Sequence, residues 1–212
     1  MTRDELTTLL GYRLNRTDMT AKMLLEMDFV QSFKLEGTGA FLPWFLESEM
    51  AATTLEIGEE RIELPSDFLG EIEGQHLWLY NPDNADFPYK ELHKSDYDKL
   101  MQKYPAVGTP TEYTISGNYI LVKPTPDNMY AIKMRYYAKD ILPSLNNVEN
   151  KWMKYAADLF IAELGVLMAG VHMRNMDLAV SFANDATIAR DRLWKKNEAR
   201  QHVNRIYGMG ED

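Results

Sequence analysis

The chain has 212 residues, of which 45% are hydrophobic and 26% charged, a composition typical of a globular protein with a core of its own. It carries a net charge of −9 and no cysteine, which excludes disulfides, thiolate metal sites and a cysteine nucleophile and fits a reducing compartment. No apolar run approaches the roughly 18 residues of a membrane span, and the acids in the first ten residues argue against a signal peptide.

The N-terminal residues predict a pair of helices. Thr2 and Glu5 have the spacing of a capping box, and the leucines between residues 6 and 14 recur on one helical face. A second helix is expected from about residue 19 to residue 35. Its apolar residues cover more than one stripe, so this helix is either central to the core or shared with a partner.

Residues 41–138 predict an antiparallel β-rich region. The segment 41–46 is very apolar and contains a proline, which indicates an anchored loop. Residues 53–57 and 61–64 alternate between apolar and polar side chains on either side of a turn, and this pattern is typical of a hairpin with one face in water. Residues 108–138 then predict three consecutive strands rich in Tyr, Ile, Val and Thr.

The last third of the chain predicts two long helices. Apolar residues recur at helical spacing from Trp152 to Val171, and Glu163 is the only charged residue between positions 159 and 171, so this helix should be buried. The final helix is expected from about residue 177 to residue 206, on the order of 45 Å at 1.5 Å per residue. Its inner stripe is rich in alanine, whereas bases dominate beyond Trp194.

Together these elements predict an α+β fold. We expect a helical bundle, made of the N-terminal helix pair and the two long C-terminal helices, with an inserted antiparallel β-rich region. The predicted organisation is a single domain over residues 1–212, with the bundle in 1–36 and 146–207 and the insertion in 41–138.

Charge is unevenly distributed along the sequence. Nine acids and one base lie between Glu47 and Glu73, whereas the final helix has the opposite balance. The bases of that helix are Arg190, Arg192, Lys195, Lys196, Arg200 and Arg205. Either these are two solvated faces, or an acidic end and a basic end meet partners or further copies of the chain.

The sequence offers no catalytic, cofactor-binding or metal-binding residues. None of its four histidines has the spacing of a metal site, and neither a phosphate-binding glycine loop nor a nucleophile elbow occurs. The pairs Glu47/Glu49 and Glu71/Glu73 would suit a glycosidase, but such pairs arise by chance in so acidic a region. The basic helix end would suit DNA, although only Trp194 lies among its bases and the chain as a whole is acidic.

The order of several segments resembles the head-tail adaptor (connector) proteins of tailed bacteriophages, especially short-tailed ones. The resemblance covers nearly the whole chain, and it depends on the order and spacing of the segments together. These segments are Pro43–Leu46, Leu64–Leu69, Gly108–Pro110, Tyr113–Val122, Pro124–Asp127, Met134–Ala138, Asn150–Met153 and Ala156–Leu159, with the paired helices after them.

The resemblance implies a structural protein of the virion, assembled in the host cytoplasm, and not an enzyme. Such adaptors form a ring beneath the portal, typically of twelve copies, that extends the DNA channel and docks the tail. The implied partners are the portal protein, tail or nozzle proteins and further copies of the chain. Viral DNA would pass without sequence-specific binding, and neither a cofactor nor a membrane is involved.

The resemblance leaves the interface residues to be assigned from the sequence. We expect the six bases of the final helix to face the portal, and Phe41, Trp44 and Phe45 to contact neighbouring subunits. Two alternatives stay open at this point. One is a phage-associated cell-wall glycoside hydrolase that uses Glu71 or Glu73, and the other is a DNA-binding module built on the basic helix.

Overall fold

The structure is a computed structural model of the whole chain, and it falls into two compact units. It describes every residue except 38–40, 74–76, 82–83, 104–105, 146 and 208–212, and only the backbone of 84–89, 103 and 201–207. The helical unit comprises Met1–Leu46 and Lys139–Asp212, and the β unit comprises Glu47–Ala138. Each is described by itself below.

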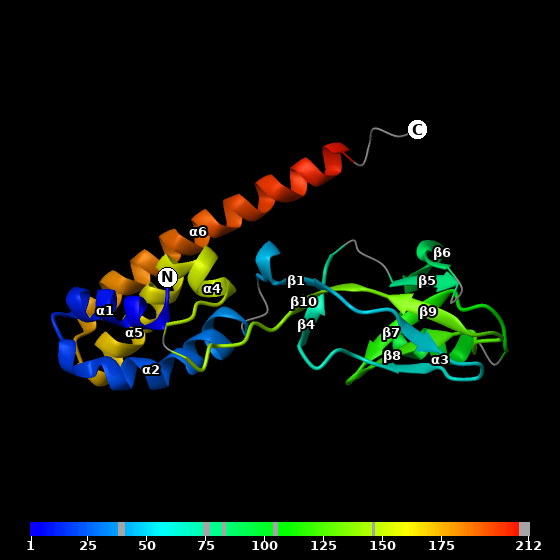
Figure 1. Cartoon of the computed structure of the whole chain (residues 1–212), viewed down its shortest axis with the longest axis horizontal. Coiled ribbons are helices and arrows are strands. Elements are labelled where there is room, and N and C mark those ends of the chain that lie inside the picture. The colour runs from blue at the N-terminus through cyan, green and yellow to red at the C-terminus, as the bar shows by residue number, and fades with distance from the viewer. Residues whose placement is uncertain (38–40, 74–76, 82–83, 104–105, 146, 208–212) are drawn as a thin grey trace. The chain divides into compact units, whose positions relative to one another are not determined.

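The helical unit is built almost entirely from helices (Figure 1). They are α1 (Arg3–Leu14), η1 (Thr17–Met19), α2 (Thr20–Phe29), η2 (Val30–Leu35), η3 (Trp44–Leu46), α4 (Lys151–Tyr155), α5 (Ala157–Leu167), η4 (Met168–His172) and α6 (Met176–Tyr207). Helix α2 continues directly into η2, and α5 into η4, and both continuations are π-helical.

The ends of α1 show why its sequence starts and stops a helix. The Thr2 hydroxyl accepts a hydrogen bond from the Glu5 backbone at 3.2 Å, while the Glu5 carboxylate accepts one from the Thr2 backbone at 2.9 Å. Asn15 ends the helix in the left-handed conformation, with φ of 51°. The predicted capping box is therefore confirmed.

Helix α5 forms the centre of the helical unit. It packs against α6 on one side and against α1, α2 and η2 on the other. Gly165 of α5 lies so close to the Phe182 ring of α6 that a Cβ atom would overlap the ring. The Ala-rich inner face of α6 permits the same close approach, and its buried members are Ala179, Phe182, Ala186, Ala189 and Leu193.

The β unit contains ten strands and one helix within the residues that the structure describes. They are β1 (Glu47–Glu49), β2 (Thr53–Leu55), β3 (Arg61–Glu63), β4 (Phe68–Glu71), β5 (Leu77–Asn81), β6 (Asn84–Lys94), α3 (Tyr97–Lys103), β7 (Glu112–Ser116), β8 (Tyr119–Lys123), β9 (Tyr130–Lys133) and β10 (Arg135–Ala138). Seven strands form one sheet in the order β2-β9-β5-β6-β7-β8-β3, and three form a second in the order β1-β10-β4.

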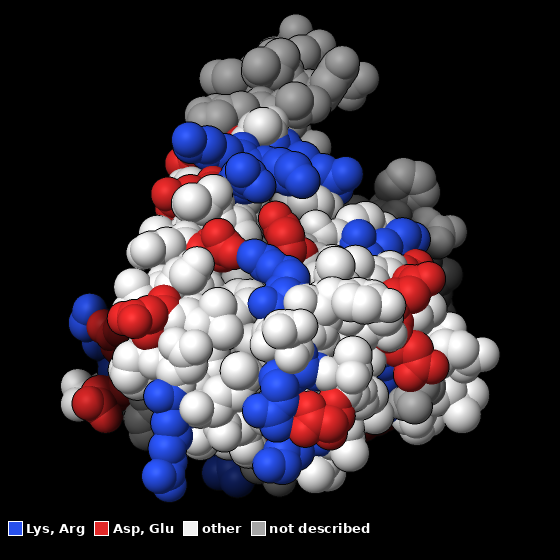
Figure 2. All heavy atoms as spheres, turned by 90° about the vertical axis from the view of Figure 1, so that its left-hand side faces the viewer, with Lys and Arg blue, Asp and Glu red and all other residues white. Residues whose placement is uncertain are grey.

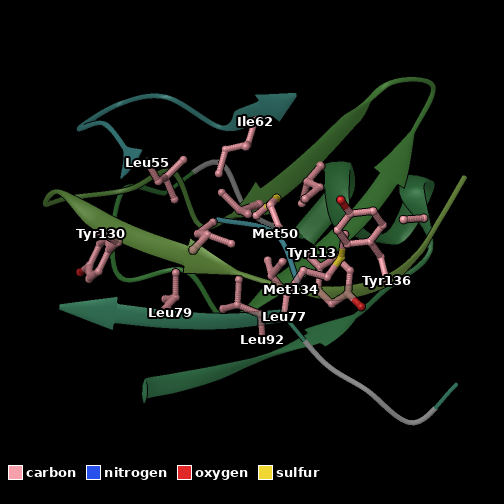
Figure 3. Packing of buried hydrophobic residues seen from close by; sticks show 14 residues of the cluster. Met50, Leu55, Ile62, Leu77, Leu79, Leu92, Tyr113, Tyr130, Met134 and Tyr136 are labelled. Atoms are coloured by element: carbon pink, nitrogen blue, oxygen red, sulfur yellow. The ribbon is translucent and has the colours of Figure 1, made fainter. Parts of the chain in front are cut away.

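The seven-stranded sheet is nearly closed and resembles a barrel. Its edge strands β2 and β3 are consecutive in the chain and are joined by a turn at Gly58, whose φ is +81°. Fourteen buried residues from its strands and neighbouring segments form one apolar cluster, and Figure 3 shows Leu55, Leu77, Leu92 and Met134 among them. Curling the sheet therefore buries one face and shortens the exposed edges.

The predicted fold class, an α+β helical bundle with an inserted antiparallel β-rich region, is wrong. The chain is a mixed α/β fold with a nearly closed, barrel-like sheet, and not a helical bundle. The β unit buries a core of its own, and β6 and β7 pair in parallel, which the prediction of a purely antiparallel region did not allow. The single-domain organisation over residues 1–212 stays a prediction.

Two local predictions in the β unit have different outcomes. The predicted hairpin of residues 53–57 with 61–64 is wrong, because β2 pairs with β9 and β3 pairs with β8. The turn at Ser116-Gly117 does join β7 and β8 as a hairpin, and Gly117 adopts the positive φ of 59° that this turn needs. The third strand expected before Ala138 is two strands, β9 and β10, which belong to different sheets.

Candidate partner-binding surfaces

The apolar segment 41–46 is anchored within the helical unit by aromatic contacts. Phe45 is 6% exposed, and its ring centroid lies 5.0 Å from that of Trp152 in an edge-on contact and 5.4 Å from that of Tyr155 in a stacked one. The Phe41 ring lies 4.8 Å from that of Trp194 on α6. The chain therefore covers much of this segment itself.

Trp44 is held by two residues near the C-terminal end of α6. Its backbone N–H donates a hydrogen bond of 2.9 Å to the Asn197 side chain, and the Arg200 guanidinium lies 4.7 Å from its ring centroid. Trp44 and Phe41 remain half-buried, whereas Phe45 is buried. The assignment of these three residues to a subunit interface stays a prediction, and only Phe41 and Trp44 present surface for it.

The six bases of the final helix divide into three groups. Arg190 pairs with Glu163 of α5, and Arg200 lies over Trp44. The Arg205 side chain lies outside the described residues. The remaining three are exposed, and within the described part of the chain no hydrogen bond or ion pair engages them. We call Arg192, Lys195 and Lys196 the basic stripe.

The basic stripe presents its charge on one side of α6. Its residues are three and four positions apart, so they occupy neighbouring places on the helix surface. Figure 2 shows Lys and Arg gathered in the upper part of the face that it views, above a region where charges of both signs are scattered. This part of α6 is therefore available to bind an acidic partner surface.

The nine acids between Glu47 and Glu73 also divide, and four of them have partners inside the β unit. Glu47 pairs with Arg135 at 2.7 Å and Glu60 with Lys123 at 2.6 Å. Asp67 accepts a hydrogen bond of 2.9 Å from the Tyr136 hydroxyl. Glu71 is engaged by Lys94 and by the Tyr113 hydroxyl.

The other five acids are exposed, and no hydrogen bond or ion pair is found for them among the described residues. They are Glu49, Glu56, Glu59, Glu63 and Glu73. In the Glu71/Glu73 pair, the Glu71 carboxylate pairs with Lys94 and accepts a hydrogen bond from Tyr113, and Glu73 is exposed. Burial raises the pKa of Tyr113, with a further contribution from Glu71, so this hydroxyl stays protonated as the donor.

A buried polar network in the helical unit was not anticipated from the sequence. Glu36, which follows η2, is 4% exposed, and its Oε1 accepts hydrogen bonds from the Trp152 indole at 2.8 Å and from Gln31 at 3.1 Å. Asp140 accepts from the backbone of Lys151 at 2.8 Å. The network thus joins the end of η2, the segment around Asp140 and the start of α4.

The pKa values of both carboxyl groups of this network, Glu36 and Asp140, are raised. Burial raises the pKa of Glu36, although hydrogen bonds from Trp152, Asp140 and Gln31 oppose the shift, and the Glu36 Oε2 atom is buried without a hydrogen-bond partner. Burial likewise raises the pKa of Asp140, against hydrogen bonds from the backbone of Trp152 and Lys151. The sequence pattern did not single out either residue, because Glu36 follows η2 and Asp140 lies between β10 and α4, outside any periodic run of apolar residues.

The described residues do not assemble a reaction centre. No group of three or more His, Asp or Glu side chains among them could hold a metal ion, and no helix in this part of the chain is long and apolar enough to span a membrane. A hollow of about 160 Å³ in the helical unit is lined mainly by apolar side chains, with Lys34 and Arg190 among them.

Comparison with known proteins identifies the family. The family model described as "SU10 adaptor protein" matches residues 1–207, which is nearly the whole chain. No curated protein matched the chain. The predicted link to short-tailed phages in particular stays a prediction. The chain belongs to the SU10 adaptor protein family, a family of phage adaptor proteins, and is thus a virion component with a structural role.

Proposed function

We propose that this protein is a head-tail adaptor that binds the portal as a ring of twelve copies, extends the DNA channel and docks the tail. The observation that carries the proposal is the family match over residues 1–207. The family supports contact with other phage head or tail proteins, and the partners that we propose are the portal protein, tail or nozzle proteins and further copies of the chain.

The basic stripe supports contact with the portal. Helix α6 has 32 residues, about 48 Å at 1.5 Å per residue. Its inner face is buried as far as Asn197, while Arg192, Lys195 and Lys196 face outward without partners among the described residues. Three exposed cations on one helix face suit an acidic surface on the portal, where ion pairs would form as the two proteins dock.

The acids of the β unit support passage of DNA without binding. Proteins bind duplex DNA largely through lysine and arginine side chains that displace the counterions of the phosphates. The five exposed acids without described partners are anions, so they provide no such contact. With a net charge of −9, a channel lined by such surfaces would repel the phosphates and let the duplex slide. We therefore propose that these acids face the channel in the assembled ring.

The proposal is tested by measuring mass in solution with and without the cognate portal. We expect the unsubstituted chain to add to the portal ring as a set of copies. A triple variant of the basic stripe, with Arg192→Gln, Lys195→Gln and Lys196→Gln, should bind about 3- to 150-fold more weakly, since each exposed ion pair contributes roughly 0.2–1 kcal/mol.

A matched control removes the same number of exposed cations elsewhere. Arg61→Gln, Lys99→Gln and Lys139→Gln change the net charge equally and leave the basic stripe intact. The control should bind the portal like the unsubstituted chain. Equal binding by the stripe variant would remove α6 from the portal interface, and a chain that never joins the portal would refute the adaptor proposal itself.

A further inference from the structure

We propose that neighbouring copies of this protein associate through two apolar stripes on opposite faces of the helical unit. The α2 stripe consists of Leu25, Phe29 and Phe33, and the α6 stripe consists of Met176, Val180 and Ile188. In this contact the α2 stripe of one copy packs on the α6 stripe of the next. The inference rests on the proposed ring and assigns the surfaces that close it.

The α2 stripe is a ridge of large side chains that the described part of the chain leaves exposed. Leu25 is 78% exposed and Phe33 is 63% exposed. The rings of Phe29 and Phe33 stack with centroids 5.0 Å apart, so they form a continuous surface. The buried residues of α2, Met23 and Met27, lie on the opposite side of the helix.

The α6 stripe is a second row of exposed apolar side chains, in which the exposed Asn184 lies between Val180 and Ile188. Val180 is 57% exposed, and Met176 and Ile188 are exposed to a similar extent. The three residues are spaced by four and eight positions, which places them along one side of the helix, about 18 Å from end to end. Ala179, Phe182 and Ala186 occupy the buried side.

The two stripes face away from each other. Helix α5 lies between α6 and the α1–α2 pair, and Figure 1 shows α2 and α6 on opposite sides of the helical unit. Because each stripe is opposite the buried side of its own helix, each points outward. Two different surfaces on opposite faces are what a head-to-tail contact between identical copies requires, whereas a two-fold dimer would use one surface twice.

Charges at the ends of the stripes are complementary. Lys22 lies one turn before Leu25 of the α2 stripe, whereas Lys34 follows Phe33 but also lines the hollow beside Arg190 and Leu193. In the α6 stripe Asp177 lies next to Met176, and Asp191 lies one turn beyond Ile188. All four are exposed, and none of them makes an ion pair among the described residues. A second copy therefore offers the exposed Lys22 an exposed aspartate beside the α6 stripe, which favours the same chain over an unrelated partner.

The absence of cysteine from the sequence makes the contact directly testable. In full-length chains assembled on the portal, one variant carries Leu25→Cys and the other carries Val180→Cys. A short bis-maleimide should link the two variants when they are mixed, and it should link neither variant to itself. A chain carrying both substitutions should give a ladder of covalent oligomers that approaches the size of the ring.

A control pair distinguishes this contact from random collision. Ile57 in the β unit is 62% exposed, close to the exposure of Val180, so Ile57→Cys mixed with Leu25→Cys should give little product. A Leu25–Leu25 link alone, or a ring that forms without the Leu25–Val180 link, would overturn the contact while the adaptor proposal stands. If the unsubstituted chain forms no ring on the portal, the proposed function fails and the contact fails with it.

Discussion

In the helical unit two carboxyl groups, Glu36 and Asp140, are held among hydrogen-bond donors, and burial raises the pKa of both. In the β unit the fourteen-residue core is apolar, and the acids lie outside it. There Glu60 behaves oppositely: although burial raises its pKa, hydrogen bonds from Lys123 and Thr125 bring the pKa below the ordinary value. The stability that Glu36 and Asp140 contribute should therefore fall as pH rises, whereas the stability that Glu60 contributes should fall as pH drops.

The units also differ in what they offer to partners. In the helical unit, large apolar side chains line up along α2 and α6 in two stripes, and the basic stripe extends along α6 beyond them. In the β unit, fourteen buried residues form the core of the nearly closed sheet, exposed apolar residues such as Ile57 and Val107 lie outside it, and five exposed acids have no hydrogen-bond or ion-pair partner among the described residues. The proposed contact between copies therefore uses the helical unit, and the proposed repulsion of DNA uses the acids of the β unit.

The largest expected effect tests whether the β unit has a core of its own. Ile132 of β9 is completely buried in the seven-stranded sheet. Ile132→Ala should lower the free energy of unfolding by about 2–5 kcal/mol, since it removes buried methyl groups and leaves a cavity. Calorimetry should show the loss in the transition of the β unit.

The exposed Met129, three residues earlier, gives the matched control, because Met129→Ala removes a side chain of similar size without opening a cavity. An unchanged melting profile for Ile132→Ala would contradict the assignment of this residue to the core.

The next largest effect tests the close packing of α5 against α6 in the helical unit. A Cβ atom on Gly165 would overlap the Phe182 ring, which is itself flanked by Arg13 at 4.9 Å. Gly165→Ala should therefore cost about 1–3 kcal/mol of unfolding free energy through overpacking, even though alanine favours helices. Gly170→Ala is the control, because its added methyl group would meet Ala179 at an ordinary 3.6 Å. Equal denaturation midpoints for the two variants would show that α5 and α6 can separate without cost.

The smallest effect tests the opposite pH responses. A carboxyl group whose folded pKa is raised stabilises the fold below its unfolded pKa, and that stability is lost as pH rises through the folded pKa. Stability from Glu36 should therefore grow as pH falls from neutrality, and Glu36→Gln should flatten this dependence in urea titrations.

Glu60→Gln is the counterpart in the β unit. A lowered folded pKa gives stability that is present above the unfolded pKa and lost as pH falls through the folded pKa, so Glu60→Gln should remove a loss of stability at acid pH. If both variants changed the pH profile in the same direction, the contrast between the units would be wrong.

Features set by neighbouring residues were predictable from the sequence. The capping box of Thr2 and Glu5, the long final helix and the Ser116-Gly117 turn all depend on residues within a few positions of one another. Strand pairing could not be predicted in this way, because β9 hydrogen-bonds to β2 and β5, which are tens of residues away in the sequence. The alternation of apolar and polar residues along a strand does not show which strand it pairs with. This is why the predicted hairpin and the predicted fold class failed.

The surfaces were predictable to a lesser extent. The bases of α6 could be counted, but the division into paired Arg190, cation–π Arg200 and the free basic stripe needed the positions of Glu163 and Trp44. The sequence showed that the second helix was apolar nearly all round, and the structure shows which side is left uncovered. Glu36 and Asp140 are separated by more than a hundred residues, so no local pattern could join them.

The pairing of β1 with β10 has a mechanical consequence. Glu47, the first residue of the β unit, pairs with Tyr137, the residue before its last, and an ion pair joins Glu47 to Arg135. If the two ends of this unit were pulled apart, the β1–β10 hydrogen bonds would break one after another in an unzipping geometry, and not all at once in a shear geometry. The two strands that close the unit are therefore the first place where it would yield under force, while its barrel-like sheet stays intact.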